Sequence, residues 1–220
     1  MNILAFDTST EKFSLAICKK DQIIYYCFRT LKNKYSKYLI PIIKDSLNKA
    51  KLKIEQINII SISTGPGSFT GIRLGIAAAK GLSMPYGIKV LGFSNMDLIM
   101  DSIDHKIKKK NFLTLMKGKK DDFYYQIFNS KKKKLTKLSF FSNYKLPNFK
   151  NYDDVMIIGN FNKKTENKFR SINKKNLFFK RKFFNAKNLI NLSKINLFKK
   201  NVKKIEPIYV YEHYAKIFSN

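Results

Sequence analysis

The chain has 220 residues, of which 44% are hydrophobic and 14% aromatic, a composition that excludes an intrinsically disordered protein. This length allows one large domain or two small ones. The formal net charge is +29, from 40 lysines and 4 arginines against 15 acidic residues. Such a charge attracts polyanions, but specific recognition of bases and phosphates favours Arg, so a drift of the whole composition toward Lys explains the excess equally well.

The sequence shows no sign of a membrane or secretory segment. No run stays apolar for the roughly 18 residues that a membrane-spanning helix needs. The first seven residues lack the basic start of a signal peptide and already include Asp7. We therefore expect a cytoplasmic protein with no membrane partner. Cys18 and Cys27 are too few to staple a chain of this size, and both are expected to be small buried residues.

The first hundred residues predict a mixed sheet with helices on its faces. Short β-prone runs alternate with segments of helical periodicity, in the order βββαβαβα. In chain order we expect strands at 2–6, 13–18 and 22–28, a helix at 36–51, a strand at 57–63, a helix at 72–83, a strand at 87–91 and a helix at 94–107.

The rest of the chain repeats that order more faintly. Strands are expected at 111–116, 122–128, 135–141, 155–158 and 177–179, followed by an amphipathic helix at 186–197. The counterpart of the first helix should fall in 143–153, where Pro147 weakens the pattern. We therefore predict an α/β protein with two related lobes, 1–104 and 105–220, of which the second is degenerate.

The positive charge is uneven between these predicted lobes. Residues 1–104 carry a net charge of +6 and residues 105–220 a net charge of +23. The second lobe is therefore where a polyanion would first be attracted. The lysine runs at 108–110, 131–134 and 174–175 fall between predicted elements, so each is interpreted as a solvated turn rather than a binding motif.

Two short motifs are candidates for facing an anion or a nucleotide. The first, DTST at 7–10, lies between two strands, although a turn that satisfies its own backbone explains it as well. The second, GPGSFTG at 65–71, joins a strand to a helix, and its hydroxyls can cap that helix where the dipole suits an anion. No Gly-Lys-Ser/Thr ends this loop, so it is not a Walker A motif. The candidate residues are Asp7, Ser9, Gly65, Gly67, Ser68 and Thr70.

The helix that follows the glycine loop carries a stripe of small residues. Gly71, Gly75 and Ala79 recur every four residues, which lets another backbone approach closely. The stripe fits packing on the protein's own sheet and packing against a partner about equally. Arg73 and Lys80 lie off the stripe and could rim such a contact.

Four segments together resemble the TsaB family, also called YeaZ. They are MNILAFDTST at 1–10, YSKYLIPIIKDSL at 35–47, STGPGSFTGIRLGIAAAKGL at 63–82 and EPIYVY at 206–211. The resemblance is close over the first hundred residues and loose over most of 105–205. It implies an actin-like (ASKHA, sugar kinase/Hsp70-type, RNase H-like) fold made of two duplicated βββαβα lobes, in agreement with the order of elements derived above.

The resemblance also implies a function. TsaB takes part in forming threonylcarbamoyladenosine (t6A) next to the anticodon of tRNAs that read ANN codons, as the heterodimer partner of the catalytic paralogue TsaD, together with the ATPase TsaE. It implies no tightly bound cofactor. It leaves open whether ATP or ADP sits at the partner interface, whether the chain forms a homodimer without its partner, and whether its lysines touch tRNA. The implied partner contacts are Leu39, Ile43, Gly71, Arg73, Gly75 and Ala79.

Histidine usage separates the chain from TsaD-like enzymes. Those enzymes hold a metal through a His-rich motif after the strand that follows the glycine helix, whereas 90–97 reads VLGFSNMD here. The two histidines, His105 and His213, are far apart in sequence. We therefore predict no metal site and no catalytic residues. Two further departures are Lys117, where the family has Asp, and Tyr35, where it usually has His.

Two other functions stay as alternatives. In an ATP-dependent phosphotransferase of the actin-like superfamily, Asp7 would organise Mg²⁺ and the loop at 65–71 would hold phosphate. The second lobe, however, lacks an Asp-x-Gly-Gly loop, and Gly159 stands without neighbouring glycines. No Ser/His/Asp set supports a peptidase. The other alternative is a basic nucleic-acid-binding module, driven by residues 105–220.

Overall fold

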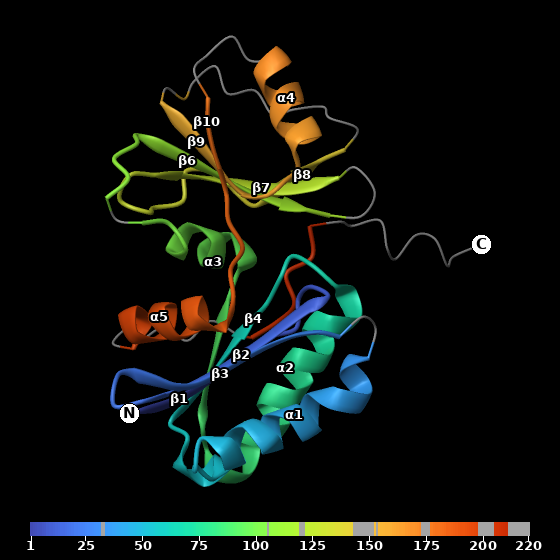
Figure 1. Ribbon diagram of the computed structural model, residues 1–220, viewed down its shortest axis with the longest axis vertical. Helices are drawn as coiled ribbons and strands as arrows, with labels where there is room; N and C mark the ends of the chain where they lie inside the picture. Colours follow the sequence, from blue (N-terminus) through green and yellow to red (C-terminus); the bar gives the residue numbers. More distant parts are fainter. Residues whose placement is uncertain are drawn as a thin grey trace, which may run out of the picture. The chain divides into compact units, whose positions relative to one another are not determined.

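The computed structural model describes residues 1–31, 34–104, 106–118, 122–142, 152, 154–172, 177–197 and 205–210. The chain forms two compact units, one made of Met1–Leu98 with Phe184–Tyr209 and the other of Ile99–Phe183 with Val210. Each unit contains a five-stranded mixed sheet among its described residues (Figure 1). No helix in the described part of the chain is long and apolar enough to cross a membrane.

The first unit begins with an antiparallel meander and continues with parallel strands. Its strands follow the order β3-β2-β1-β4-β5. The first three pair antiparallel, and β4 and β5 then extend the sheet in parallel to β1. The bounds are β1 Asn2–Asp7, β2 Lys12–Lys19, β3 Gln22–Thr30, β4 Ile59–Ser63 and β5 Lys89–Phe93.

Helices cover both faces of this sheet, because alternate residues of β1 point to opposite sides. Leu4 and Phe6 pack with the helices α1 (Tyr35–Lys49) and α2 (Phe69–Ser83). Ile3 and Ala5 pack with α5 (Ala186–Asn196) from the far end of the chain. Two 3₁₀ turns, Ile54–Gln56 and Met84–Tyr86, follow the two longer helices.

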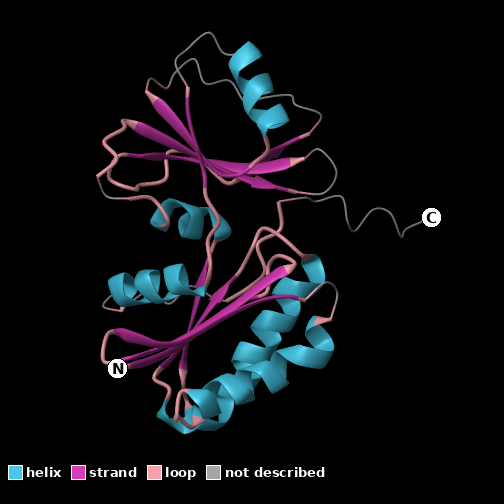
Figure 2. Cartoon of the chain, in the orientation of Figure 1, coloured by secondary structure: helices cyan, strands magenta, loops and turns pink. Residues whose placement is uncertain are grey.

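The second unit repeats the strand order of the first. Its sheet runs β10-β9-β6-β7-β8, so β6, β9 and β10 take the places of β1, β4 and β5. The bounds are β6 Asn111–Lys117, β7 Phe123–Asn129, β8 Ser139–Phe141, β9 Val155–Asn160 and β10 Phe178–Arg181 (Figure 2). The helix α4 (Lys163–Ile172) packs on one face through the buried Phe169. The short α3 (Asn95–Asp101) contains the division between the two units.

Three sequence predictions need correction after β5. The helix α4 was not predicted, because KKTENKFRSI is strongly polar and its buried side shows only Thr165 and Phe169 at helical spacing. The strand expected at 135–141 is confined to Ser139–Phe141. The helix expected at 94–107 ends at Asp101. The helix expected in 143–153 lies outside the described residues, except for residue 152.

The predicted boundary between 104 and 105 is also wrong for the C-terminal part. Phe184–Tyr209 belongs to the first unit, because α5 covers an apolar sheet face there. Two hydrogen bonds fix it: Ser14 Oγ accepts from the Ala186 amide at 2.9 Å, and Ser61 Oγ donates to the Leu189 carbonyl at 3.3 Å. Counted by unit rather than by sequence half, the net charges are +13 and +16. The positive charge is thus shared almost evenly.

The lysine runs fall only partly in solvated turns. Asn129 Oδ1 accepts from the amides of Lys131 and Lys133, which closes the 131–134 run into a tight exposed turn as expected. In the 108–110 run, by contrast, Lys109 is largely covered and pairs with Asp154 at 2.7 Å. The run at 174–175 lies outside the described residues.

Candidate functional site

The glycine loop connects β4 to α2 and is shaped by close backbone approaches. Gly65 has φ of +101°, which favours glycine, and a Cβ on it would lie 2.8 Å from Ile72 Cδ1. A Cβ on Gly67 would lie 2.2 Å from the Ser9 carbonyl oxygen. Ser68 Oγ accepts from the Gly71 amide at 3.2 Å and caps α2, as its position in the motif predicted.

The glycine loop is closed against the turn after β1. The Ser68 amide donates to the Ser9 carbonyl at 2.7 Å. Asn95 Nδ2 donates to both Ser9 Oγ, at 2.8 Å, and the Pro66 carbonyl, at 2.6 Å. At Ser9 the two predicted anion-facing motifs are therefore in direct contact with each other.

Asp7 takes part in this closure and does not face an open site. The residue is only 2% exposed, and its Oδ1 accepts from the Ser9 amide at 2.9 Å, from Ser9 Oγ at 2.7 Å and from Ser63 Oγ. Burial raises the pKa of Asp7 above its ordinary value, while these hydrogen bonds act in the opposite direction. Of the two explanations of the DTST motif, the self-satisfied turn is the one observed, because the side chains of Asp7 and Ser9 bond to the chain's own groups.

The substitution Asp7→Asn should change how stability depends on pH. Because the folded pKa is raised above 3.8, the stability that the Asp7 carboxyl contributes is present at low pH and lost as the pH rises through the raised pKa. Asparagine does not titrate. The melting temperature of the variant minus that of the wild type should therefore become more positive from about pH 4 to about pH 7, as circular dichroism can measure. A melting-temperature difference that stays constant across this pH range would contradict a raised pKa for Asp7.

The small-residue stripe of α2 packs against the chain itself. A Cβ on Gly71 would lie 2.1 Å from the Thr8 carbonyl oxygen, and one on Gly75 would lie 2.3 Å from Thr8 Oγ1. Thr8 Oγ1 also donates to the Gly71 carbonyl at 2.7 Å. Ala79 is fully buried in the core on this face of the sheet. The structure thus selects internal packing among the two explanations of the stripe.

The other three predicted partner contacts differ in exposure. Leu39 and Ile43 are buried in the core between α1 and the sheet. Together with the stripe residues they are buried within the chain, so Leu39, Ile43, Gly71, Gly75 and Ala79 offer little surface for the direct partner contact expected from the sequence. Arg73, in contrast, is exposed on α2.

Arg73 belongs to a cluster that sequence reasoning missed. Its guanidinium carbon lies 3.5 Å from the centre of the Phe69 ring, and its Nε donates to the Tyr209 hydroxyl at 2.7 Å. The segment that contains Tyr209 is fixed by the Ile208 amide, which donates to the Thr64 carbonyl at 2.8 Å. The resemblance of 206–211 to the family was a signal that this segment matters, but not where it packs.

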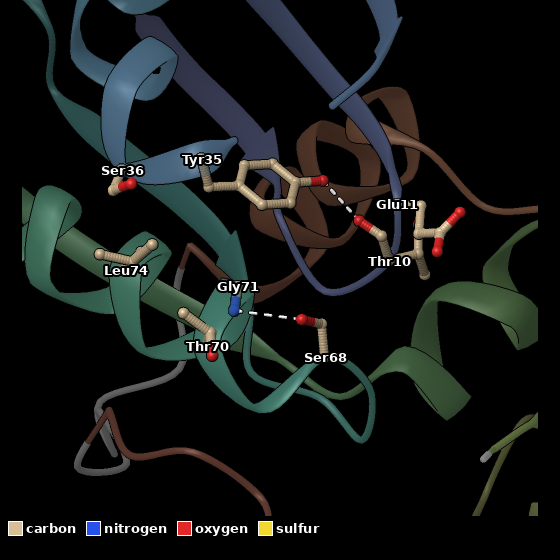
Figure 3. Close-up of a pocket in the computed structure, with 8 residues that line it drawn as sticks. All are labelled: Thr10, Glu11, Tyr35, Ser36, Ser68, Thr70, Gly71 and Leu74. Atoms are coloured by element: carbon tan, nitrogen blue, oxygen red, sulfur yellow. Dashed lines mark hydrogen bonds between the residues drawn. The ribbon is translucent and has the colours of Figure 1, made fainter. Parts of the chain in front are cut away.

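A small pocket lies between the first turns of α1 and α2 and the turn after β1 (Figure 3). Its volume is about 170 Å³. The buried Tyr35 closes one side by donating its hydroxyl to the Thr10 carbonyl, and burial raises the pKa of Tyr35. Ser68 and Thr70, two of the predicted anion-facing residues, do reach this pocket. The lining residues are Thr10, Glu11, Tyr35, Ser36, Ser68, Thr70, Gly71 and Leu74.

On their exposed sides, α1 and α2 carry small and apolar residues. Ile40 is 49% exposed on α1, next to the exposed Pro41. On α2, Ala77 and Gly81 are exposed, and a Cβ on Gly81 would meet no atom within 4 Å. We call the exposed residues Ile40, Pro41, Ala77 and Gly81 the outer helix surface.

Among the described residues, no group of three or more His, Cys, Asp and Glu side chains could hold a metal ion. The two histidines, His105 and His213, lie outside the described part of the chain. Lys117 ends β6, and its neighbours 119–121 are likewise not described.

Sequence comparisons find a matching family model and several relatives named for tRNA threonylcarbamoyl modification. Residues 29–209 match the family model described as TsaD, tRNA N6-adenosine threonylcarbamoyltransferase. The tRNA threonylcarbamoyladenosine biosynthesis protein TsaB of Buchnera aphidicola subsp. Schizaphis graminum is 35% identical over 123 residues, or 56% of this chain and 58% of that protein. TsaB of Escherichia coli is 33% identical over 96 residues, or 44% of this chain and 41% of that protein. The match thus spans about half the length of these curated relatives.

Two solved structures from Pseudomonas aeruginosa share the fold. One is named YeaZ, with a TM-score of 0.76 and 17% identity, covering 94% of this chain and 99% of that chain. The other is described as an uncharacterized protein with similarity to peptidase YEAZ, with a TM-score of 0.76 and 18% identity, covering 96% and 99%. At these identities the likeness shows the fold. The predicted actin-like α/β fold with duplicated lobes is confirmed.

Proposed function

Because the chain belongs to the TsaB (YeaZ) family, we propose that it is a non-catalytic subunit in the formation of t6A next to the anticodon of tRNAs that read ANN codons. It acts as the heterodimer partner that activates TsaD, with the ATPase TsaE joining the complex. The observation that carries this proposal is the closure of the glycine loop on Ser9, with Asp7 satisfied by Ser9 and Ser63. An actin-like site that transferred phosphate would need that space for its substrate.

The proposed surface for TsaD is the outer helix surface rather than the buried residues expected from the sequence. Its side chains are small or apolar and exposed, which suits the centre of a protein interface. Arg73 and Lys80 are also exposed on α2 and would lie toward the rim. We assign no tightly bound cofactor to the chain. ATP or ADP at the partner interface would meet the chain at the pocket that Thr70 and Leu74 line.

Complex formation tests this proposal directly. Size-exclusion chromatography with light scattering, in moderate salt, should give a one-to-one complex when the chain is mixed with the TsaD paralogue from the same source. Without TsaD, the same measurement reports whether the chain forms a homodimer. Separate elution of the two proteins at concentrations well above about 10 µM, where interfaces of ordinary size are saturated, would contradict the proposal.

The purified chain should not hydrolyse ATP. Asp7 is buried and its Oδ1 already accepts from Ser9 and Ser63, so we expect phosphate release equal to that of a blank reaction with Mg²⁺ present. A coupled phosphate assay measures this, with a Gly67→Ala preparation as the control for a contaminating ATPase. Turnover that the wild type shows and this variant loses would instead support the phosphotransferase alternative.

A further inference from the structure

The edge of the second sheet combines aromatic rings with cations. The strand β10 is an edge strand of its sheet (Figure 1). The chain continues from its end at Arg181 into Lys182 and Phe183. Phe178 is 42% exposed and Phe183 is 56% exposed, and the residues Lys180, Arg181 and Lys182 lie between them. Alternate residues of a strand share a face, so Lys180 lies on the same side as Phe178. We call 178–183 the basic edge.

The sequence around the basic edge contains no acidic residue. Between Glu166 and Glu206 the chain has neither Asp nor Glu. Compositional drift toward Lys explains abundant cations, but it does not explain why two of the four arginines, Arg170 and Arg181, gather at this place.

Two carboxylates among the described residues lie beside the basic edge, those of Asp154 and Glu166. Each already forms ion pairs with other cations. Asp154 accepts from Lys109 Nζ at 2.7 Å, and the same ammonium lies 3.3 Å from the centre of the Phe178 ring. Glu166 is paired with Arg170 at 3.1 Å and with Lys163 at 3.3 Å. Arg181 approaches Glu166 only to 3.9 Å, so most of its hydrogen-bonding capacity is not used there.

We propose that the basic edge binds single-stranded RNA, with phosphates on the cations of 180–182 and bases stacked on the exposed rings. Proteins that bind single strands combine a positive groove with aromatic stacking positions, and Arg suits phosphate through its planar fork. The rings of Phe178 and Phe183 are separated by cations and form no continuous apolar face, and the chain has no Trp, so a membrane surface fits less well.

This inference goes beyond the proposed function and rests on it only in naming the RNA. In the t6A complex the RNA would be a tRNA, whose anticodon loop is single-stranded. The binding itself belongs to this chain and needs no TsaD. Its success or failure is therefore separate from that of the TsaD complex.

Charge removal at the basic edge is the first test. The full chain is titrated into a labelled transcript of a tRNA that reads an ANN codon, and into a labelled single-stranded RNA, with fluorescence anisotropy as the readout. The triple variant K180Q/R181Q/K182Q should weaken binding by about tenfold or more and flatten the dependence of log K on log salt. Its melting temperature is measured beside that of the wild type, because Arg181 also contacts Glu166.

The matched control removes the same charge from an exposed surface of the same unit. The triple variant K131Q/K133Q/K137Q changes three lysines in and after the turn between β7 and β8. It should change RNA affinity by no more than about twofold, since non-specific attraction depends on charges near the bound strand. An equal loss in both triples would mean that the whole positive surface attracts RNA, and would overturn the proposal.

Removal of the rings is the second test. The double variant F178A/F183A should weaken binding of the single-stranded RNA by about tenfold while leaving the salt slope unchanged, because stacking is not ionic. Tyr86→Ala removes an exposed ring from the first unit and should have no effect. Wild-type RNA affinity in both basic-edge variants would overturn the proposal. A second result would also overturn it: the wild type binds phosphatidylserine vesicles but not RNA, and the basic-edge variants lose the vesicle binding. The edge would then be a membrane contact.

Discussion

Replacing Ala77 with Arg on the outer face of α2 is expected to weaken binding to the TsaD paralogue by about a hundredfold or more while leaving the fold intact. Ala77 is exposed, so the longer side chain clashes with nothing in the free chain. At the centre of the proposed interface the guanidinium would be buried without a partner, which costs about 3 kcal/mol or more. Isothermal titration calorimetry with purified TsaD measures the change.

Ser171→Arg is the matched control for this prediction. It also places Arg at a small exposed position on a helix, but at the end of α4 in the second unit. Its affinity for TsaD should equal that of the wild type. If Ala77→Arg binds TsaD as tightly as Ser171→Arg does, the outer helix surface is not the interface.

Adding one methyl group to α2 should have opposite effects at two glycines. In Gly71→Ala the new Cβ would lie 2.1 Å from the Thr8 carbonyl oxygen, a backbone atom that cannot move away without shifting β1. We expect a loss of about 3 kcal/mol in the free energy of unfolding. In Gly81→Ala the Cβ meets nothing within 4 Å, and the better helix former should stabilise the protein by up to about 1 kcal/mol.

Urea unfolding followed by circular dichroism compares these variants under the same conditions. Because both change Gly to Ala in one helix, differences in the unfolded chain largely cancel. Similar effects at Gly71 and Gly81 would contradict internal packing of the stripe on Thr8. The same packing makes Gly75→Arg unsuitable as an interface test, because a clash with Thr8 would disturb the fold before any partner was met.

The first lobe could be predicted from its sequence because its local signals agree. The strands and helices up to β5 fall within a few residues of their expected bounds, since apolar runs, turn residues and the Ser68 cap all point to the same elements. In the second lobe the polar helix α4 was not predicted, because it packs on the sheet mainly through Phe169. Only Thr165 and Phe169 are buried at helical spacing, and so short a pattern is easily overlooked among polar residues.

The candidate site was predicted less well, because its contacts join residues that are far apart in the chain. Which side of the Gly71 stripe packs inward depends on where Thr8 lies, 63 residues earlier. The contact of Arg73 with Tyr209 spans 136 residues. The return of α5 to the first sheet likewise changed the boundary between units. Motif spacing identifies such residues but does not show which are buried.

Reconstitution of t6A formation shows whether TsaD needs this chain for the modification. Unmodified tRNA reading an ANN codon is incubated with TsaD, TsaE, ATP and a threonylcarbamoyl donor, with and without this chain, and incorporated threonine is counted. We expect t6A to form at a useful rate only when the chain is present, and the chain without TsaD to form none. Equal rates of t6A formation with and without the chain would contradict its role as the activating partner of TsaD.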